Sequence, residues 1–230
     1  MEDKNNMNNI TWYFVLLILV ISYLLGSFQT SYIFGKLFKK VDIRDYGSGN
    51  AGTTNSFRVF GAKIGVAVLL IDILKGIVAV LLVKLAFKCD SVALQLLAGL
   101  FVTLGHNYPF YMKFKGGKGV AAAIGIFAAV DWRIFLIAGL IGLLILVTTR
   151  YMSVASLTFQ VLTFIGFVFF YLKDPEFYYI LVIAAIYPIL SFFQHRKNIK
   201  GLKDGTENKL WGKGKKKVKL DEPNQVTKTK

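Results

Sequence analysis

Long uncharged apolar stretches are the feature of this sequence that most restricts its fold. Hydrophobic residues make up 55% of the 230 residues, more than one water-soluble core of this size can bury. A membrane-spanning helix needs about 20 apolar residues, and most of the stretches reach that length. The sequence therefore predicts an all-α integral membrane protein. The stretches are residues 12–35, 64–83, 91–112, 119–130, 134–149, 151–172 and 177–194.

The number of spans depends on residues 119–149. Two short stretches there are separated only by Asp131, Trp132 and Arg133, so they form either two spans with a tight turn or one long helix. With seven spans, 22 of the 28 Lys and Arg residues lie on one side and 5 on the other, with Lys75 inside a span. Positive charge concentrates in cytoplasmic loops. We therefore predict seven transmembrane helices, with the N-terminus outside.

Three glycine-rich polar segments interrupt the apolar pattern. In the seven-span arrangement they follow the first, third and seventh spans, so all three lie on the cytoplasmic face. Buried polar groups are costly when unpaired, so such segments favour a binding function. The three motif segments are Gly47–Gly61 (GSGNAGTTNSFRVFG), Gly105–Ala121 (GHNYPFYMKFKGGKGVA) and His195–Glu207 (HRKNIKGLKDGTE).

The first two motif segments have features of an anion site. In the first, Ser48 and Arg58 accompany glycines that can turn backbone N–H groups toward a phosphate, although such loops are more often simple turns. In the second, Lys118 stands between glycines at the start of a span, where a helix N-terminus favours an anion. The next residue is Gly119 rather than Ser or Thr, which excludes a nucleotide-hydrolysing P-loop.

The third motif segment places His195 and Asn198 on one helix face, three residues apart. A single histidine at a membrane boundary is more often an interfacial residue than a catalyst. The sequence has only two histidines, however, and the other, His106, lies in the second motif segment. This distribution favours one site shared by the three motif segments.

Other polar residues indicate structural roles. Asp72 and Lys75 lie three residues apart within a span, which favours an ion pair over the alternative of a supporting role at the site. Carboxylates do not cluster in the motif segments, and Cys89 is the only cysteine. The sequence therefore predicts no metal and no cofactor.

Together, the three motif segments resemble the cytoplasmic motifs of the bacterial acyl-phosphate:glycerol-3-phosphate acyltransferase family, PlsY. The resemblance implies a multi-pass protein of the bacterial plasma membrane whose active site faces the cytoplasm. It also implies acyl transfer from acyl phosphate to the sn-1 hydroxyl of glycerol 3-phosphate, giving lysophosphatidic acid and phosphate for phospholipid biosynthesis. The implied catalytic positions are Ser48, Arg58, Lys118, His195 and Asn198. The implied substrate-binding positions are Gly49, Asn50, Gly52, Asn55, His106, Gly116, Gly117, Arg196 and Glu207.

The sequence divides into two parts. Residues 1–207 are expected to form the membrane acyltransferase domain, and residues 208–230 a lysine-rich, disordered cytoplasmic tail. The net charge of +15 indicates attraction to anionic lipid rather than to nucleic acid. The expected partners are glycerol 3-phosphate, acyl phosphate and the lipid bilayer.

The implied reaction needs no protein nucleophile, because acyl phosphates are already activated. The hydroxyl proton passes either to His195 or to a substrate phosphate, and the sequence leaves both routes open. A transporter of phosphorylated metabolites is the main alternative, but residues 1–115 and 116–230 show none of the internal repetition typical of transporters. A membrane scaffold would explain the basic tail but not the motif segments.

Overall fold

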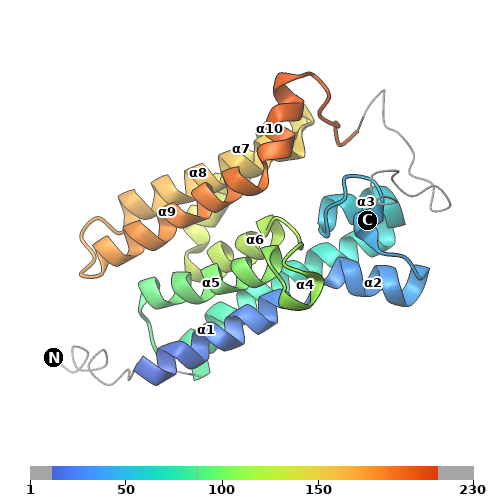
Figure 1. Ribbon diagram of the computed structural model, residues 1–230. Coiled ribbons are helices and arrows are strands. Elements are labelled where there is room, and N and C mark those ends of the chain that lie inside the picture. Colours follow the sequence, from blue (N-terminus) through green and yellow to red (C-terminus); the bar gives the residue numbers. More distant parts are fainter. Residues whose placement is uncertain (1–11, 87, 212–230) are drawn as a thin grey trace.

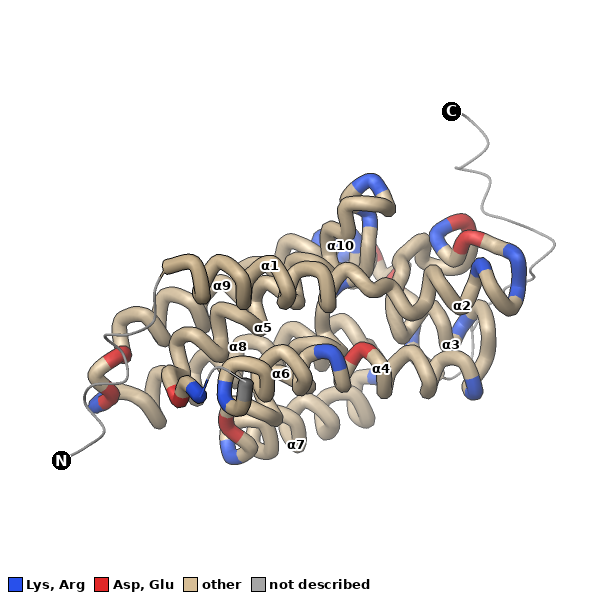
Figure 2. Tube along the Cα trace, turned by 90° about the horizontal axis from the view of Figure 1, so that it is seen from below, with Lys and Arg blue, Asp and Glu red and all other residues tan. Residues whose placement is uncertain are grey.

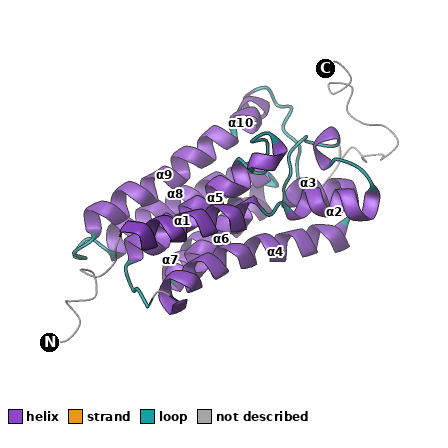
Figure 3. Ribbon diagram, turned by 60° about the horizontal axis from the view of Figure 1, so that its bottom comes forward, coloured by secondary structure: helices purple, strands orange, loops and turns teal. Residues whose placement is uncertain are grey.

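The computed structural model describes residues 12–86 and 88–211, and this part of the chain is helical without any strand (Figures 1 and 3). The all-α prediction is therefore confirmed. The α-helices are α1 (Trp12–Ser27), α2 (Thr30–Lys39), α3 (Thr53–Phe60), α4 (Ala62–Leu81), α5 (Val92–Asn107), α6 (Val120–Val130), α7 (Trp132–Thr149), α8 (Met152–Phe170), α9 (Phe177–Gln194) and α10 (Arg196–Lys203). Shorter elements are the 3₁₀ turns η3 (Ile43–Asp45) and η5 (Phe110–Met112), and the π-helix η4 (Leu82–Ala86).

Five helical segments in the described residues are long and apolar enough to cross a membrane. They are Trp12–Lys39, Ala62–Leu85, Trp132–Thr149, Met152–Phe170 and Phe177–Gln194. Helix α6 has only 11 residues, which cover about 17 Å of a hydrocarbon layer about 30 Å thick. The seven crossings and the external N-terminus remain predictions. The first 11 residues and most of the predicted tail, residues 212–230, lie outside the described part.

The structure separates α6 and α7 at Asp131, so residues 120–149 form two helices. Asp131 has an extended backbone (φ −148°, ψ 103°), and its carboxylate accepts a 2.9 Å hydrogen bond from the backbone N–H of Arg133. The Arg133 guanidinium lies 2.7 Å from the same carboxylate, and the Tyr171 hydroxyl donates to it at 3.0 Å. Asp131 thus caps α7 and joins this turn to the end of α8.

Glycines bring two pairs of helices into backbone contact. Gly26 of α1 and Gly105 of α5 each face the main chain of the other helix, and a Cβ atom at either position would overlap it. Gly76 of α4 and Gly125 of α6 have the same relationship. Lipid gives helices no hydrophobic reason to associate, so small residues that permit close approach are a principal means of packing them. These contacts fix α1 on α5 and α4 on α6.

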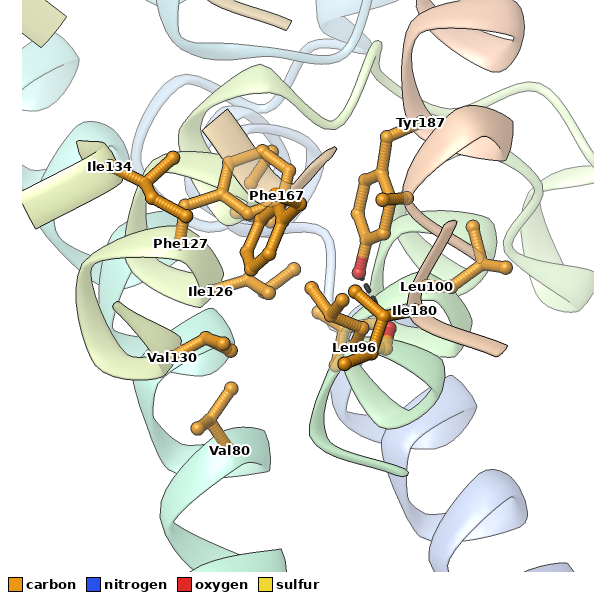
Figure 4. Close-up of a cluster of buried hydrophobic side chains, with 14 of the residues drawn as sticks. Val80, Leu96, Leu100, Ile126, Phe127, Val130, Ile134, Phe167, Ile180 and Tyr187 are labelled. Carbon is orange, nitrogen blue, oxygen red and sulfur yellow. Dashed lines mark hydrogen bonds between the residues drawn. The ribbon is translucent and has the colours of Figure 1, made fainter. Parts of the chain in front are cut away.

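A buried aromatic cluster joins α9 to this core (Figure 4). The ring centroid of Phe127 on α6 lies 5.0 Å from that of Tyr187 on α9 and 5.8 Å from that of Phe167 on α8. The Tyr187 hydroxyl donates a 2.7 Å hydrogen bond to the carbonyl of Leu96 on α5, so its polar atom is satisfied within the apolar cluster. Helix α9 therefore has a fixed position against the helices that flank the second motif segment.

Candidate active site

The three motif segments meet at one end of the helical bundle. Lys118, just before α6, places its Nζ 2.5 Å from the Oδ1 atom of Asn198 on α10. Arg58 on α3 reaches the segment that follows α10, where its Nη2 donates to the carbonyl of Asn208 at 3.4 Å. Figure 2 shows many of the charged residues at this end, around α2, α3 and α10. Residues separated by up to 150 positions in sequence thus form one cluster.

The side-chain amide of Asn198 is held from both sides. Its Oδ1 accepts from Lys118, and its Nδ2 donates to Oε1 of Glu207 at 2.8 Å. A lysine ammonium can only donate and a carboxylate can only accept, so these two partners determine which way the amide is turned. The hydroxyl of Ser153, at the start of α8, donates to the same Glu207 oxygen at 3.0 Å. Glu207 therefore connects α10 with α8.

His195 lies between α9 and α10 and is buried. Its Nδ1 is 2.8 Å from the carbonyl oxygen of Ser191. Because a carbonyl only accepts, Nδ1 carries the proton and Nε2 has a free lone pair. Burial, together with the nearby Lys118 ammonium, lowers the pKa of His195 to about 4, although the bond to Ser191 opposes the shift. The imidazole is neutral at pH 7 and presents a hydrogen-bond acceptor.

Lys118 and Arg58 give the site an excess of positive charge. Burial lowers the pKa of Lys118 to about 8; the Glu207 carboxylate opposes this shift, and Arg58 adds to it. Burial also lowers the pKa of Arg58, against the attraction of the same carboxylate. The Lys118 ammonium and the Arg58 guanidinium therefore share one carboxylate, that of Glu207, in a partly desolvated site. Such an arrangement suits a phosphate dianion.

The first motif segment is an ordered loop held by Asn55. The buried Asn55 side chain accepts a 2.9 Å hydrogen bond from the N–H of Ser48 and donates to the carbonyls of Ile43 and Tyr46, at 3.3 and 3.0 Å. Ser48 is exposed, and so is Gly49, which has a φ of 72° that glycine adopts without strain. Asn55 therefore supports the loop from inside, while Ser48 lies at its surface.

The N-cap of helix α3 is Gly52, which provides no side-chain cap, and the Asn50 side chain lies against it. An uncapped helix start leaves N–H groups that an anion can bind. Arg58 is carried on the same short helix. The structure therefore places Asn50 and Gly52 directly before the helix that carries Arg58.

The glycines of the second motif segment bind backbone atoms of the protein. The N–H groups of Gly116 and Gly117 donate to the carbonyls of Asn107 and His106, both at 3.0 Å. Both glycines are positions to which the family resemblance assigns substrate binding. The start of α6 has no side-chain cap either, because its N-cap is Gly119 with a φ of 78°. Lys118 is thus the second segment's direct contribution to the cluster.

Two predicted substrate-binding residues have their partners elsewhere. The His106 imidazole is buried and contacts the ammonium of Lys75, at 2.7 Å from Nδ1 to Nζ. Arg196 is exposed on α10, where it donates to the carbonyl of Phe193 at 2.9 Å and lies 4.4 Å above that ring. Within the described residues, the structure brings neither side chain to the Lys118–Asn198 contact.

Ser153 is a site residue that the sequence did not indicate. It is one of several polar residues in this span, together with Ser156, Gln160 and Thr163, and only its tertiary contact with Glu207 distinguishes it from them. No group of three His, Cys, Asp or Glu residues suited to a metal occurs in residues 12–86 and 88–211. The polar groups of the cluster are those of an anion site.

Known proteins resemble this chain over most of its length. The sequence model of the glycerol-3-phosphate acyltransferase family matches residues 16–205. The glycerol-3-phosphate acyltransferase of Shouchella clausii is 46% identical over 191 residues, which cover 82% of this chain and 92% of the relative. That of Thermoanaerobacter sp. (strain X514) is 41% identical over 197 residues, covering 86% and 96%.

Solved structures agree with these relatives. The crystal structure of PlsY (YgiH), an integral membrane glycerol 3-phosphate acyltransferase, in its glycerol 3-phosphate form superposes with a TM-score of 0.77 at 38% identity. The match covers 86% of this chain and 96% of that one. Its lysophosphatidic acid form gives a TM-score of 0.73 at 37% identity, covering 85% and 94%. The resemblance found in the motif segments is confirmed, and the chain belongs to the glycerol-3-phosphate acyltransferase family.

Proposed function

We propose that this protein transfers an acyl group from acyl phosphate to the sn-1 hydroxyl of glycerol 3-phosphate, forming lysophosphatidic acid and inorganic phosphate. The observation that carries the proposal is the cluster of Lys118, Arg58, Asn198 and His195 at the end of the bundle. Two cations with one carboxylate, Glu207, fit substrates that are both phosphates. The solved relatives in glycerol 3-phosphate and lysophosphatidic acid forms support a substrate and product of this kind.

In the proposed reaction the hydroxyl oxygen of glycerol 3-phosphate bonds to the acyl carbon, and the bond from that carbon to the phosphate oxygen breaks. Lys118 and Arg58 hold the phosphates and stabilise the negative charge that develops as phosphate leaves. Ser48 and the uncapped start of α3 add hydrogen-bond donors to phosphate oxygens. No covalent acyl-protein intermediate is required.

His195 orients the attacking hydroxyl, and the proton ends on phosphate. The Nε2 lone pair accepts the hydroxyl hydrogen bond, but a pKa of about 4 makes the imidazole a weak base at pH 7. The phosphate group of a phosphate ester has a second pKa of about 6, so a substrate phosphate holds the proton better than the imidazole does. Asn198, fixed by Lys118 and Glu207, keeps the lysine directed into the site.

We further infer seven membrane crossings, an external N-terminus and a site that faces the cytoplasm of a bacterial cell. The asymmetric distribution of Lys and Arg supports this orientation. Single cysteines in a Cys89→Ser background test it, with Ser48→Cys at the site end and Lys173→Cys between α8 and α9. In intact cells, a membrane-impermeant maleimide should label only the cysteine at position 173. Labelling at position 48 would reverse the orientation.

The activity is tested with purified protein in detergent, palmitoyl phosphate and glycerol 3-phosphate. We expect lysophosphatidic acid and phosphate in equal amounts, and none with Lys118→Ala. Palmitoyl-coenzyme A replaces palmitoyl phosphate in a parallel reaction, and product from that donor alone would refute the proposed acyl donor. If neither donor gives product but proteoliposomes take up glycerol 3-phosphate, the protein is a transporter.

A further inference from the structure

A buried polar cluster lies inside the helical bundle, beside the second motif segment. Asp72 and Lys75 of α4 and His106 of α5 are only 1%, 4% and 3% exposed. The Lys75 Nζ lies 3.0 Å from Oδ1 of Asp72 and 2.7 Å from Nδ1 of His106. It also donates, at 3.2 Å each, to the carbonyls of Gly26 and Phe28, where the helix is interrupted between α1 and α2.

This cluster does more than neutralise a buried charge. An ion pair between Asp72 and Lys75 alone would satisfy charge balance on one helix, and desolvating such a pair is costly. Here Lys75 also binds His106 of α5 and the carbonyl of Gly26 near the end of α1. The Thr30 hydroxyl of α2 donates to Asp72 at 3.1 Å. The cluster therefore holds four helices in one arrangement.

The contact with Lys75 determines which edge of His106 carries a proton. An ammonium can only donate, so Nδ1 accepts and the proton lies on Nε2. The Nε2 edge faces the backbone of Gly117, and a Cβ at that glycine would overlap both Nε2 and the carbonyl oxygen of Ala51. The main-chain carbonyl of His106 accepts from the N–H of Gly117 at 3.0 Å and from Nε2 of Gln29 at 2.5 Å.

Gly117 thus packs against both His106 and the first motif segment. Its Cβ position meets Nε2 of the His106 imidazole and also the carbonyl oxygen of Ala51. Gly117 directly precedes Lys118, and Ala51 directly precedes Gly52, the N-cap of the helix that carries Arg58. The Nε2 edge of His106 therefore lies against the loop that contacts the start of α3.

We propose that His106 is a positioning residue, anchored by Lys75, whose Nε2 edge sets the spacing between the Lys118 loop and the helix that carries Arg58. It acts through the backbone of Gly117, which packs against that of Ala51, and does not touch substrate. The expected effect on the KM for glycerol 3-phosphate rests on the proposed function. The position of Lys118 is tested without catalysis, through the pKa of that lysine.

Two substitutions of His106 separate its two edges. In His106→Asn the amide oxygen takes the place of Nδ1, so the bond to Lys75 is kept while the reach to Gly117 is lost. In His106→Gln the longer side chain places its amide near the position of Nε2, so the edge toward Gly117 is kept while Lys75 is released. If His106 positions the loops, the Gln variant keeps the Lys118 pKa and the KM for glycerol 3-phosphate closer to the wild-type values than the Asn variant does. If it only satisfies Lys75, the order is reversed.

The first measurement is the pKa of Lys118 itself, from the pH dependence of its modification by an amine reagent, quantified by mass spectrometry. The groups that face Lys118 are Asn198, His195, Glu207 and Arg58, and they are unchanged in both variants. We expect a pKa near 8 in the wild type and the Gln variant. We expect a rise toward the usual 10.5 in the Asn variant, because Lys118 loses its buried position.

The second measurement is the KM for glycerol 3-phosphate, which should rise at least about tenfold in His106→Asn and less in His106→Gln. A purely structural role would reduce the yield of folded protein in both variants and leave the Lys118 pKa and the KM unchanged. That result, or better function in His106→Asn than in His106→Gln, would overturn the inference. An inactive wild type with the expected pKa pattern would refute the proposed function and leave the positioning role supported.

Discussion

The charge of Lys118 predicts how the activity depends on pH. Burial is the main cause that lowers the pKa of this lysine to about 8, and Arg58 adds to it while Glu207 opposes it. The proposed reaction needs the ammonium form to hold phosphate. Activity should therefore fall as the pH rises through the pKa of Lys118, because the proton is lost from that group.

The size of the fall follows from the ionised fraction. With a pKa of about 8, Lys118 is about 90% charged at pH 7 and about 9% charged at pH 9, a tenfold decrease. His195, with a pKa of about 4, is neutral throughout this range, and the substrate phosphates are past their second pKa of about 6. A Lys118→Arg variant should lose this dependence, because a guanidinium keeps its charge throughout this pH range.

The assay measures initial phosphate release between pH 6.5 and 9.5, with reactions lacking protein as a correction for spontaneous hydrolysis. The value of kcat/KM reports the free enzyme and should fall with an apparent pKa near 8. The decrease in kcat should come at higher pH, because a bound phosphate stabilises the ammonium. A wild-type kcat/KM that stays constant to pH 9.5, or an equal decrease in Lys118→Arg, would refute the assignment.

Three further outcomes are expected. Arg58→Ala should lower kcat/KM for glycerol 3-phosphate by more than about tenfold, and Arg58→Lys by less, because the lysine restores charge without the guanidinium geometry; equal losses would contradict this. Gly125→Ala should lower the melting temperature in detergent through overlap with the backbone of Ile73. Gly139→Ala on α7 serves as control and should not, because a Cβ there would make only an ordinary contact with Phe135, at 3.8 Å. Deletion of residues 212–230 should leave kcat/KM unchanged, since the bond from Arg58 to Asn208 is kept.

The helices could be predicted largely from sequence because the signal is local. The apolar stretch at residues 177–194 coincides with α9, and that at 151–172 contains α8. The apolar pattern alone fits either one or two helices at residues 119–149, and the distribution of Lys and Arg favoured two. Asp131 decides it by capping α7, and its bond to Tyr171, 40 residues away, was not visible in the sequence.

The composition of the cluster could be predicted, but the use of several polar groups could not. Lys118 and Asn198 lie together as the motif segments indicated. Asn55 and Gly117 instead bind backbone carbonyls, and His106 binds the buried Lys75. These partners are determined by the packing of segments that are distant in sequence. A motif shows that such residues belong near a site, whereas only their contacts separate groups that support a loop from groups that face outward.

The backbone contacts at Gly26 and Gly105, and at Gly76 and Gly125, have a consequence for divergence within the family. Main-chain atoms are the same in every residue, so the spacing between these helices does not depend on the volume of the surrounding side chains. Residues that face the acyl chains of the bilayer are then free to change as a bacterium adapts to another temperature or lipid composition. A relative that shares 38% of its residues keeps the same fold, as this freedom would allow.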